Sequence, residues 1–363
     1  MNHPGGDASA PTPNRTPWAR ILIGSLVLAA IGAALAPTFQ EAGALRGSLA
    51  HLDWRWVLAA ILCQVGVYCC VAAILGVAIR ACEERAGFAY LVFVAFAFMF
   101  ANRCLPGPAV AGLATLVVLL RRRSVSAGAA QTAAAGFYVA DYASFFALAL
   151  AALLSLVHSG DAAELHPRVL LPAILIIAIG AAFALAALRS QERLERLAER
   201  WTLRTMTLLR RPNPQAMAQS AGASVSGFHT RWTAMTARPG PLAASCAVAL
   251  LMHVAEVGTL LCAARAFHFT LAPAAATAGY VGGNLAAIVS LLPGGLGFFE
   301  GAMTVTFHRL GGMRPADALG VTLLYRLLSV WLPIPVLLGV VREALRTNIS
   351  QQNPDSRKSA EVQ

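Results

Sequence analysis

Six ionisable side chains interrupt long apolar stretches of this 363-residue sequence, and they are its first candidates for chemistry. They are Arg103, Asp141, Glu256, Arg265, Glu300 and Arg326, with His253 one helical turn before Glu256. Each would cost about 2.5–3.5 kcal/mol at the centre of a bilayer unless it is paired or hydrated. We therefore expect pairing, first of all between Glu300 and Arg326. Such a pair either locks the structure or takes part in substrate binding or proton coupling.

The composition explains why charged side chains are rare in these stretches. Hydrophobic residues make up 58% of the chain and charged residues 12%, about half of the ~25% usual for soluble domains. The sequence is therefore that of an integral membrane protein. The net charge of +11 comes almost entirely from arginines between the apolar runs. At such positions arginines set membrane topology, so we expect no nucleic-acid partner.

The spacing of cysteine and histidine predicts neither a metal site nor a disulfide framework. The seven cysteines lie in or beside apolar segments and form no CxxC pair, so we interpret them as small apolar side chains. His253 and Glu256 have a spacing suited to two metal ligands, but no second pair accompanies them. We expect no metal or other cofactor, and no catalytic constellation indicates an enzyme.

Two proline-glycine breaks lie inside otherwise apolar sequence. Leu105-Pro106-Gly107 divides residues 87–123, and Leu292-Pro293-Gly294 opens the second break, which continues as GLGFFEG to residue 301. Irregular backbone at membrane depth survives only where protein or a water-filled cavity covers it. We therefore expect two re-entrant helical hairpins. For the first break, two tight spans joined by a surface turn are the alternative.

The order of apolar runs predicts an all-α integral membrane fold with about six full transmembrane helices and two broken hairpins in an inverted repeat. The expected parts are a disordered cytoplasmic tail (1–17), a transmembrane domain (18–346) and a disordered tail (347–363). The domain divides into repeat one (55–157), a cytoplasmic basic linker (189–241) and repeat two (242–343). An amphipathic helix on the membrane surface is expected in the first part of residues 189–241, and the rest, through Gly240, is interpreted as the connecting linker. The first apolar run is read as an uncleaved anchor, with a cleaved signal peptide as the alternative.

Arginine bias sets the expected orientation. Residues 189–238 contain nine arginines and three glutamates, so this region and both termini are predicted to be cytoplasmic. One span, residues 169–188, separates the repeats, which would invert the second relative to the first. Inverted repeats whose broken helices meet near the midplane are a transporter design, with the substrate site between the repeats.

The helix halves that follow the breaks supply the predicted binding site. Their free N–H groups and positive dipole ends favour an anion such as a phosphate head group. A glycine hinge that only packs tightly is the alternative. The expected substrate-binding residues are Asn102, Arg103, Pro106, Gly107, Asp141, Tyr142, Glu256, Pro293, Gly294, Gly295, Gly297, Glu300, Tyr325 and Arg326.

Three motifs, LLPGGLGFFEGAM, LLYRLLSVWLP and ANRCLPG, resemble the lysylphosphatidylglycerol synthase transmembrane-region family of flippase-like proteins over roughly residues 20–345. The resemblance implies lipid translocation in a bacterial inner membrane, with Glu300 and Arg326 at the PGGLGxxEG and YR positions of the family. Repeat one departs from the family, because PAVAGLATL follows its Pro-Gly and GFYVADY surrounds Asp141. No aminoacyl-transferase domain follows the last apolar run, so we do not expect the chain to make lysyl-lipid alone.

The function expected from these features is a lipid flippase that moves a polar or glycosylated phospholipid between leaflets. One alternative is an intramembrane lipid-modifying enzyme that uses Glu256 or Glu300 as its base. Another is an accessory subunit whose basic residues 189–238 dock a lipid-synthesis enzyme. The expected partners are membrane lipids with anionic or glycosylated head groups, and a homo-oligomer is left open.

Overall fold

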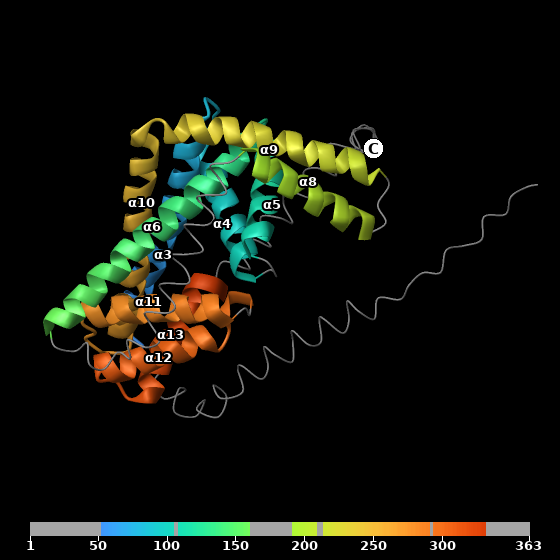
Figure 1. The fold of residues 1–363 in the computed structure, drawn as a ribbon. Helices are drawn as coiled ribbons and strands as arrows, with labels where there is room; N and C mark the ends of the chain where they lie inside the picture. Colours follow the sequence, from blue (N-terminus) through green and yellow to red (C-terminus); the bar gives the residue numbers. More distant parts are fainter. Residues whose placement is uncertain (1–51, 105–107, 160–190, 209–212, 291–292, 332–363) are drawn as a thin grey trace, which may run out of the picture. The chain divides into compact units, whose positions relative to one another are not determined.

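The computed structural model describes residues 52–104, 108–159, 191–208, 213–290 and 293–331 of the chain, and this part is all-helical with no strand (Figure 1). The described residues belong to one compact unit, Ala44–Gln363. The predicted all-α class is confirmed. Among the described helices, three are long and apolar enough to cross a membrane: α3 (Trp54–Ala81), α6 (Ala127–Ser159) and α10 (Pro239–Ala266). The predicted spans at 18–37 and 169–188 lie outside the described residues.

Helices α3 and α10 pack against each other over much of their length. The backbone N–H of Asp53, at the start of α3, donates to the carbonyl of Ala266 at the end of α10 (3.0 Å), so the two helices run antiparallel. The Asp53 side chain also accepts from the Arg55 N–H, which caps α3. Small residues allow close contact: a Cβ on Gly258 would lie 3.5 Å from the sulfur of Cys63.

Both predicted breaks are helix ends in the structure. The first separates α4 (Phe88–Cys104) from α5 (Pro108–Arg121). The second separates α11 (Pro273–Ser290) from α12 (Phe298–Gly311), with the 3-10 turn η2 (Pro293–Gly295) between them. The 14 residues of α5 or of α12 rise only about 21 Å, less than the ~30 Å of a bilayer core. The described helices thus repeat one order, a long helix and then a broken pair.

Helix α13 (Pro315–Arg326) follows α12 and changes pitch at its end. It begins with proline at the first helical position, where the missing N–H has no helical partner to lose. Residues Leu327–Trp331 then form the π-helical turn η3. Single π turns are frequent at functional sites because they leave backbone groups free for other partners.

The region between the repeats contains a helix that the sequence analysis did not predict. Helix α8 (Gln191–Leu208) occupies the stretch expected to be helical. The rest of the predicted linker contains a second helix, α9 (Pro214–Thr236). Helices α8 and α9 lie side by side (Figure 1), and α9 also packs on α6. The apolar stripe that buries α9 consists of Phe228, Trp232 and Met235.

Candidate functional site

The two breaks touch each other. Helix α4, which ends at the first break, packs on the turn η2 of the second. A Cβ added to Gly294 would lie 3.0 Å from the carbonyl oxygen of Arg103, and Gly294 has φ +64°. Glycine is therefore required here both for the turn and for the close approach of the two backbones. Pro106 and Gly107 lie outside the described residues.

The predicted pair of Glu300 and Arg326 is confirmed, and it closes the second break. Arg326 Nε donates to Glu300 Oε1 at 2.5 Å, and Nη2 donates to the carbonyl of Gly294 at 2.6 Å. The guanidinium also lies 4.5 Å from the ring centre of Phe299. The two charged side chains are only 8% and 15% exposed. Arg326 is thus held by a carboxylate, a carbonyl and an aromatic face at once.

Glu300 has a second contact that changes the expected anion site. Its Oε2 accepts from the backbone N–H of Gly297, the residue just before α12, at 2.6 Å. The sequence analysis expected the N–H groups at this end to be free for a ligand. That expectation was wrong for Gly297, because a carboxylate three residues along the helix is well placed to cap its first turn.

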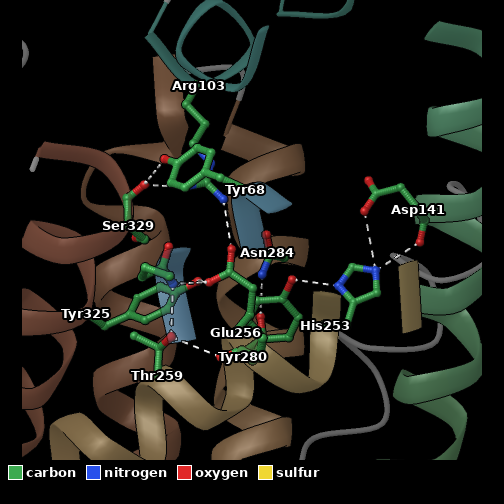
Figure 2. Close-up of polar contacts among 12 residues, drawn as sticks. Tyr68, Arg103, Asp141, His253, Glu256, Thr259, Tyr280, Asn284, Tyr325 and Ser329 are labelled. Atoms are coloured by element: carbon green, nitrogen blue, oxygen red, sulfur yellow. Dashed lines mark hydrogen bonds and ion pairs between the residues drawn. The ribbon is translucent and has the colours of Figure 1, made fainter. Parts of the chain in front are cut away.

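Arg103 and Glu256 form a second ion pair, beside the contact between the breaks (Figure 2). Arg103 Nη2 lies 3.1 Å from Glu256 Oε1. Oε2 of Glu256 also accepts from Gln64 Nε2 (2.8 Å) and from the Tyr325 hydroxyl (2.9 Å). Glu256 is 2% exposed, and a carboxylate buried this far needs such donors to offset its lost hydration. The polar network joins α3, α4, α10 and α13.

A backbone carbonyl in η3 holds the other side of Arg103. Arg103 Nη1 donates to the carbonyl oxygen of Ser329, and the hydroxyl of Tyr68 lies 3.4 Å from the same atom. Residue 333, four positions after Ser329, is a proline. Proline has no N–H to complete an α-helical bond to this carbonyl. Among the described residues, the Ser329 carbonyl accepts from the side chains of Arg103 and Tyr68.

Asp141 pairs with His253 and does not join the Glu300–Arg326 pair. His253 Nε2 lies 3.3 Å from Asp141 Oδ1 and 3.1 Å from the carbonyl of the same residue. His253 Nδ1 is 2.9 Å from the hydroxyl of Tyr280 on α11. Both ring nitrogens are thus engaged by groups of the chain. Among the described residues, no group of three or more potential metal ligands is present.

The remaining predicted site residues join neighbouring helices. Asn102 Oδ1 accepts from the hydroxyl of Tyr138 (2.8 Å), and the Asn102 amide fills the space that a Cβ on Gly112 would need. Tyr142 is 41% exposed and stacks on Tyr138 with ring centres 6.5 Å apart. In the second break, Gly295 has φ +67° and a Cβ there would overlap Ala287.

Several groups of this network were not predicted from the sequence, among them Gln64, Tyr68, Tyr280 and the Ser329 carbonyl. Neutral polar residues were predicted only where they stand beside a charged one, as Asn102, Tyr142 and Tyr325 do. Gln64, which interrupts the run LAAILCQVGVYCC, has no charged neighbour. Proline four residues after Ser329 was the available signal for a free carbonyl. Oε1 of Gln64 is buried and has no hydrogen-bond partner among the described residues.

The helices and their buried charges define an integral membrane protein with two contacting helix breaks. The family described as lysylphosphatidylglycerol synthase TM region matches residues 19–336. The chain therefore belongs to this family, a family of membrane domains connected with lipid biosynthesis or modification. No significant match is found among curated proteins.

Proposed function

We propose that the protein is a lipid flippase that moves a phospholipid with an anionic or glycosylated head group between leaflets of a bacterial inner membrane. The observation that carries the proposal is Arg103, a partly exposed cation at the contact between two helix breaks. Its side chain is 23% exposed, against 8% for Arg326. A guanidinium matches the geometry of a phosphate oxygen pair, so Arg103 is the better placed of the two to receive a head group.

The proposed topology has about six full spans and two re-entrant hairpins in an inverted repeat, with both termini in the cytoplasm. The short second helices of both broken pairs support the hairpins, since neither α5 nor α12 is long enough to cross a bilayer core. Membership of the family supports a membrane-embedded lipid substrate. In this arrangement the first break opens toward the cytoplasm and the second toward the outside.

We assign different roles to the two ion pairs. Arg103, which is paired with Glu256 in the absence of lipid, binds the lipid phosphate. Arg326 and Glu300 hold the second break in shape, since their charges already satisfy each other and the backbone of the turn. A rigid turn keeps Gly294 against the Arg103 backbone, so it preserves the position of the phosphate-binding cation.

Translocation in reconstituted vesicles tests the proposal. The probe is phosphatidylglycerol with a fluorescent label on one acyl chain, and a membrane-impermeant reductant reports the fraction in the outer leaflet. Wild-type protein should make the whole labelled pool accessible within the assay, whereas Arg103→Gln should leave the inner leaflet protected as in protein-free vesicles. The matched control is Arg265→Gln, because Arg265 is exposed at the end of α10 and lies 6.0 Å from the ring centre of Trp56. Equal rates for wild-type and protein-free vesicles would contradict the proposal.

Head-group selectivity is tested with the same vesicles. Labelled phosphatidylcholine carries a cationic choline beside its phosphate, which competes with Arg103 for the phosphate charge. We expect slower movement of this lipid than of phosphatidylglycerol. An identical rate for both lipids would mean that the cation does not select the head group.

A further inference from the structure

The cation assigned to the lipid phosphate already holds an anion that belongs to the protein. Glu256 Oε1 lies 3.1 Å from Arg103 Nη2, and the carboxylate is almost fully buried. A phosphate arriving at Arg103 would meet a guanidinium whose charge is already balanced. Two anions on one cation would also repel each other strongly in surroundings of low dielectric constant. Phosphate binding therefore requires that Glu256 give up its charge or its contact.

Gln64 can supply a hydrogen-bond acceptor for a protonated Glu256. The Gln64 amide nitrogen donates to Glu256 Oε2 and to Thr259 Oγ1 (3.1 Å). Its oxygen is buried without a partner among the described residues. A half-turn of the amide would exchange these two atoms. The Gln64 oxygen would then accept a hydrogen bond from protonated Glu256.

The groups that face Glu256 come from each helix around it. Arg103 on α4 is the cation among them, Gln64 on α3 and Tyr325 on α13 donate to the carboxylate, and Tyr68 on α3 lies beside Arg103 (Figure 2). Tyr280 on α11 stands between Glu256 and His253, the histidine one turn earlier on α10 (Figure 2). Beyond His253 lies Asp141 on α6. The cation that is paired with Glu256 is thus the one whose charge a lipid phosphate would neutralise.

We propose that Glu256 is a built-in competitor for the lipid phosphate, and that a proton on Glu256 releases Arg103 to bind it. The inference rests on the proposed function for the identity of the ligand. Linkage makes the effect reciprocal: a proton on Glu256 strengthens phosphate binding, and a bound phosphate draws a proton onto Glu256. Each lipid that binds would therefore take up a proton at Glu256, and each lipid released would free it.

Binding of labelled phosphatidylglycerol to the purified full-length protein in neutral detergent micelles, followed by fluorescence anisotropy, tests the exchange. Wild-type affinity should rise as pH falls from mildly alkaline to mildly acidic. Glu256→Gln, which cannot ionise, should bind about tenfold more tightly at neutral pH, about 1.4 kcal/mol, with no pH dependence. Arg103→Gln should bind weakly at every pH. The inference would be overturned if Glu256→Gln bound phosphatidylglycerol no more tightly than the wild-type protein does at neutral pH.

Tyr325→Phe is a second test that keeps the carboxylate and the arginine. It removes the hydroxyl that donates to Glu256 and keeps the ring that stacks on Phe299. Because the ionised carboxylate loses a donor, the pH at which affinity rises should move upward by about one unit. An unchanged pH profile, or one moved downward, would contradict the proposal even if Glu256→Gln does not fold.

A soluble ligand separates this inference from the proposed function. Glycerophosphoglycerol carries the same phosphodiester anion without acyl chains. Binding of glycerophosphoglycerol alone, with the predicted pH dependence, would support the exchange at Arg103 and overturn the lipid as its ligand. Binding of phosphatidylglycerol with the predicted pH dependence, but without translocation in vesicles, would support the exchange and contradict the flippase. Translocation with pH-independent binding would support the flippase and overturn the exchange.

Discussion

The two buried ion pairs share their chemistry and differ in what they connect. Glu300 lies on α12, in the second broken segment, and Arg326 lies 26 positions later on α13. Arg103 and Glu256 are 153 positions apart and join α4 to α10. The first pair also binds the backbone of its own turn, and the second binds a carbonyl of η3. The pair of Glu300 and Arg326, the local pair, therefore shapes a break. The pair of Arg103 and Glu256, the remote pair, holds separate parts of the chain together around a partly exposed cation.

The pairs also differ in what remains when the arginine is removed. Without Arg326, Glu300 would keep the N–H of Gly297 as a donor. Without Arg103, Glu256 would keep both Gln64 and Tyr325. An uncompensated buried charge is the main cost of breaking such a pair. We therefore expect loss of Arg326 to affect stability more, and loss of Arg103 to affect function more.

The largest effect on stability is expected for Arg326→Met. This substitution leaves Glu300 buried without its cation and should lower the free energy of unfolding by about 3–5 kcal/mol. Unfolding by denaturant in micelles measures the change. Arg265→Met, at an exposed arginine, is the matched control and should change stability little. The double variant Arg326→Met with Glu300→Gln should recover part of the loss. Equal stability of the two single variants would break the comparison.

Gly295→Ala tests whether the local pair depends on the shape of its turn. Alanine there must adopt positive φ and its Cβ would overlap Ala287, which together should cost about 2–4 kcal/mol. Gly301→Ala serves as the control because no atom lies within 4 Å of the added Cβ. In the helix interior that change should be neutral or stabilise by up to about 1 kcal/mol. Thermal unfolding of the two variants should therefore separate them clearly.

Arg103→Gln should cost less stability than Arg326→Met, about 1–3 kcal/mol, because two neutral donors stay on Glu256. A double-mutant cycle with Glu256→Gln sharpens the comparison. The double variant should cost about 0.5–3 kcal/mol less than the sum of the two single variants, since the side chains are in contact. Additive effects of the two substitutions would show that the pair contributes no interaction energy.

The smallest effect is expected for a third ion pair, which is much more exposed. Arg231 on α9 lies 3.4 Å from Glu84, and the side chains are 36% and 22% exposed. Glu84 also accepts from the backbone N–H and the hydroxyl of Ser126. Arg231→Gln should therefore cost less than about 1 kcal/mol, and added salt should reduce the difference further. A loss of stability as large as that of Arg326→Met would mean that solvent exposure does not determine how much these ion pairs contribute to stability.

The same contrast explains which parts of the site could be predicted from sequence. The breaks and the Glu300–Arg326 pair depend on local signals: prolines and glycines inside apolar sequence, and charges close to them. The Arg103–Glu256 pair depends on the packing of α4, α10 and α13, which no local pattern determines. Asp141 was predicted to bind substrate, but its partner His253 could not be predicted, because their contact depends on the packing of α6 against α10.

The fold shows a similar limit. The long apolar runs predicted α3, α6 and α10 well, because their length and hydropathy leave few alternatives. Helix α9 was missed because its sequence is weakly apolar and begins after a proline-rich stretch. Its stripe of Phe228, Trp232 and Met235 was visible at helical spacing. The stripe predicts a packed helix only when it is known that α6 covers it, and the sequence does not show that contact.

The most direct test of the account compares translocation of phosphatidylglycerol by two variants, with rates normalised to folded protein. Arg103→Gln removes the cation between the breaks, and the double variant Arg326→Met with Glu300→Gln removes the local pair without leaving a buried charge. We predict that Arg103→Gln has the rate of protein-free vesicles, while the double variant keeps a substantial part of the wild-type rate. A wild-type rate for Arg103→Gln would contradict the central claim that this arginine receives the lipid phosphate.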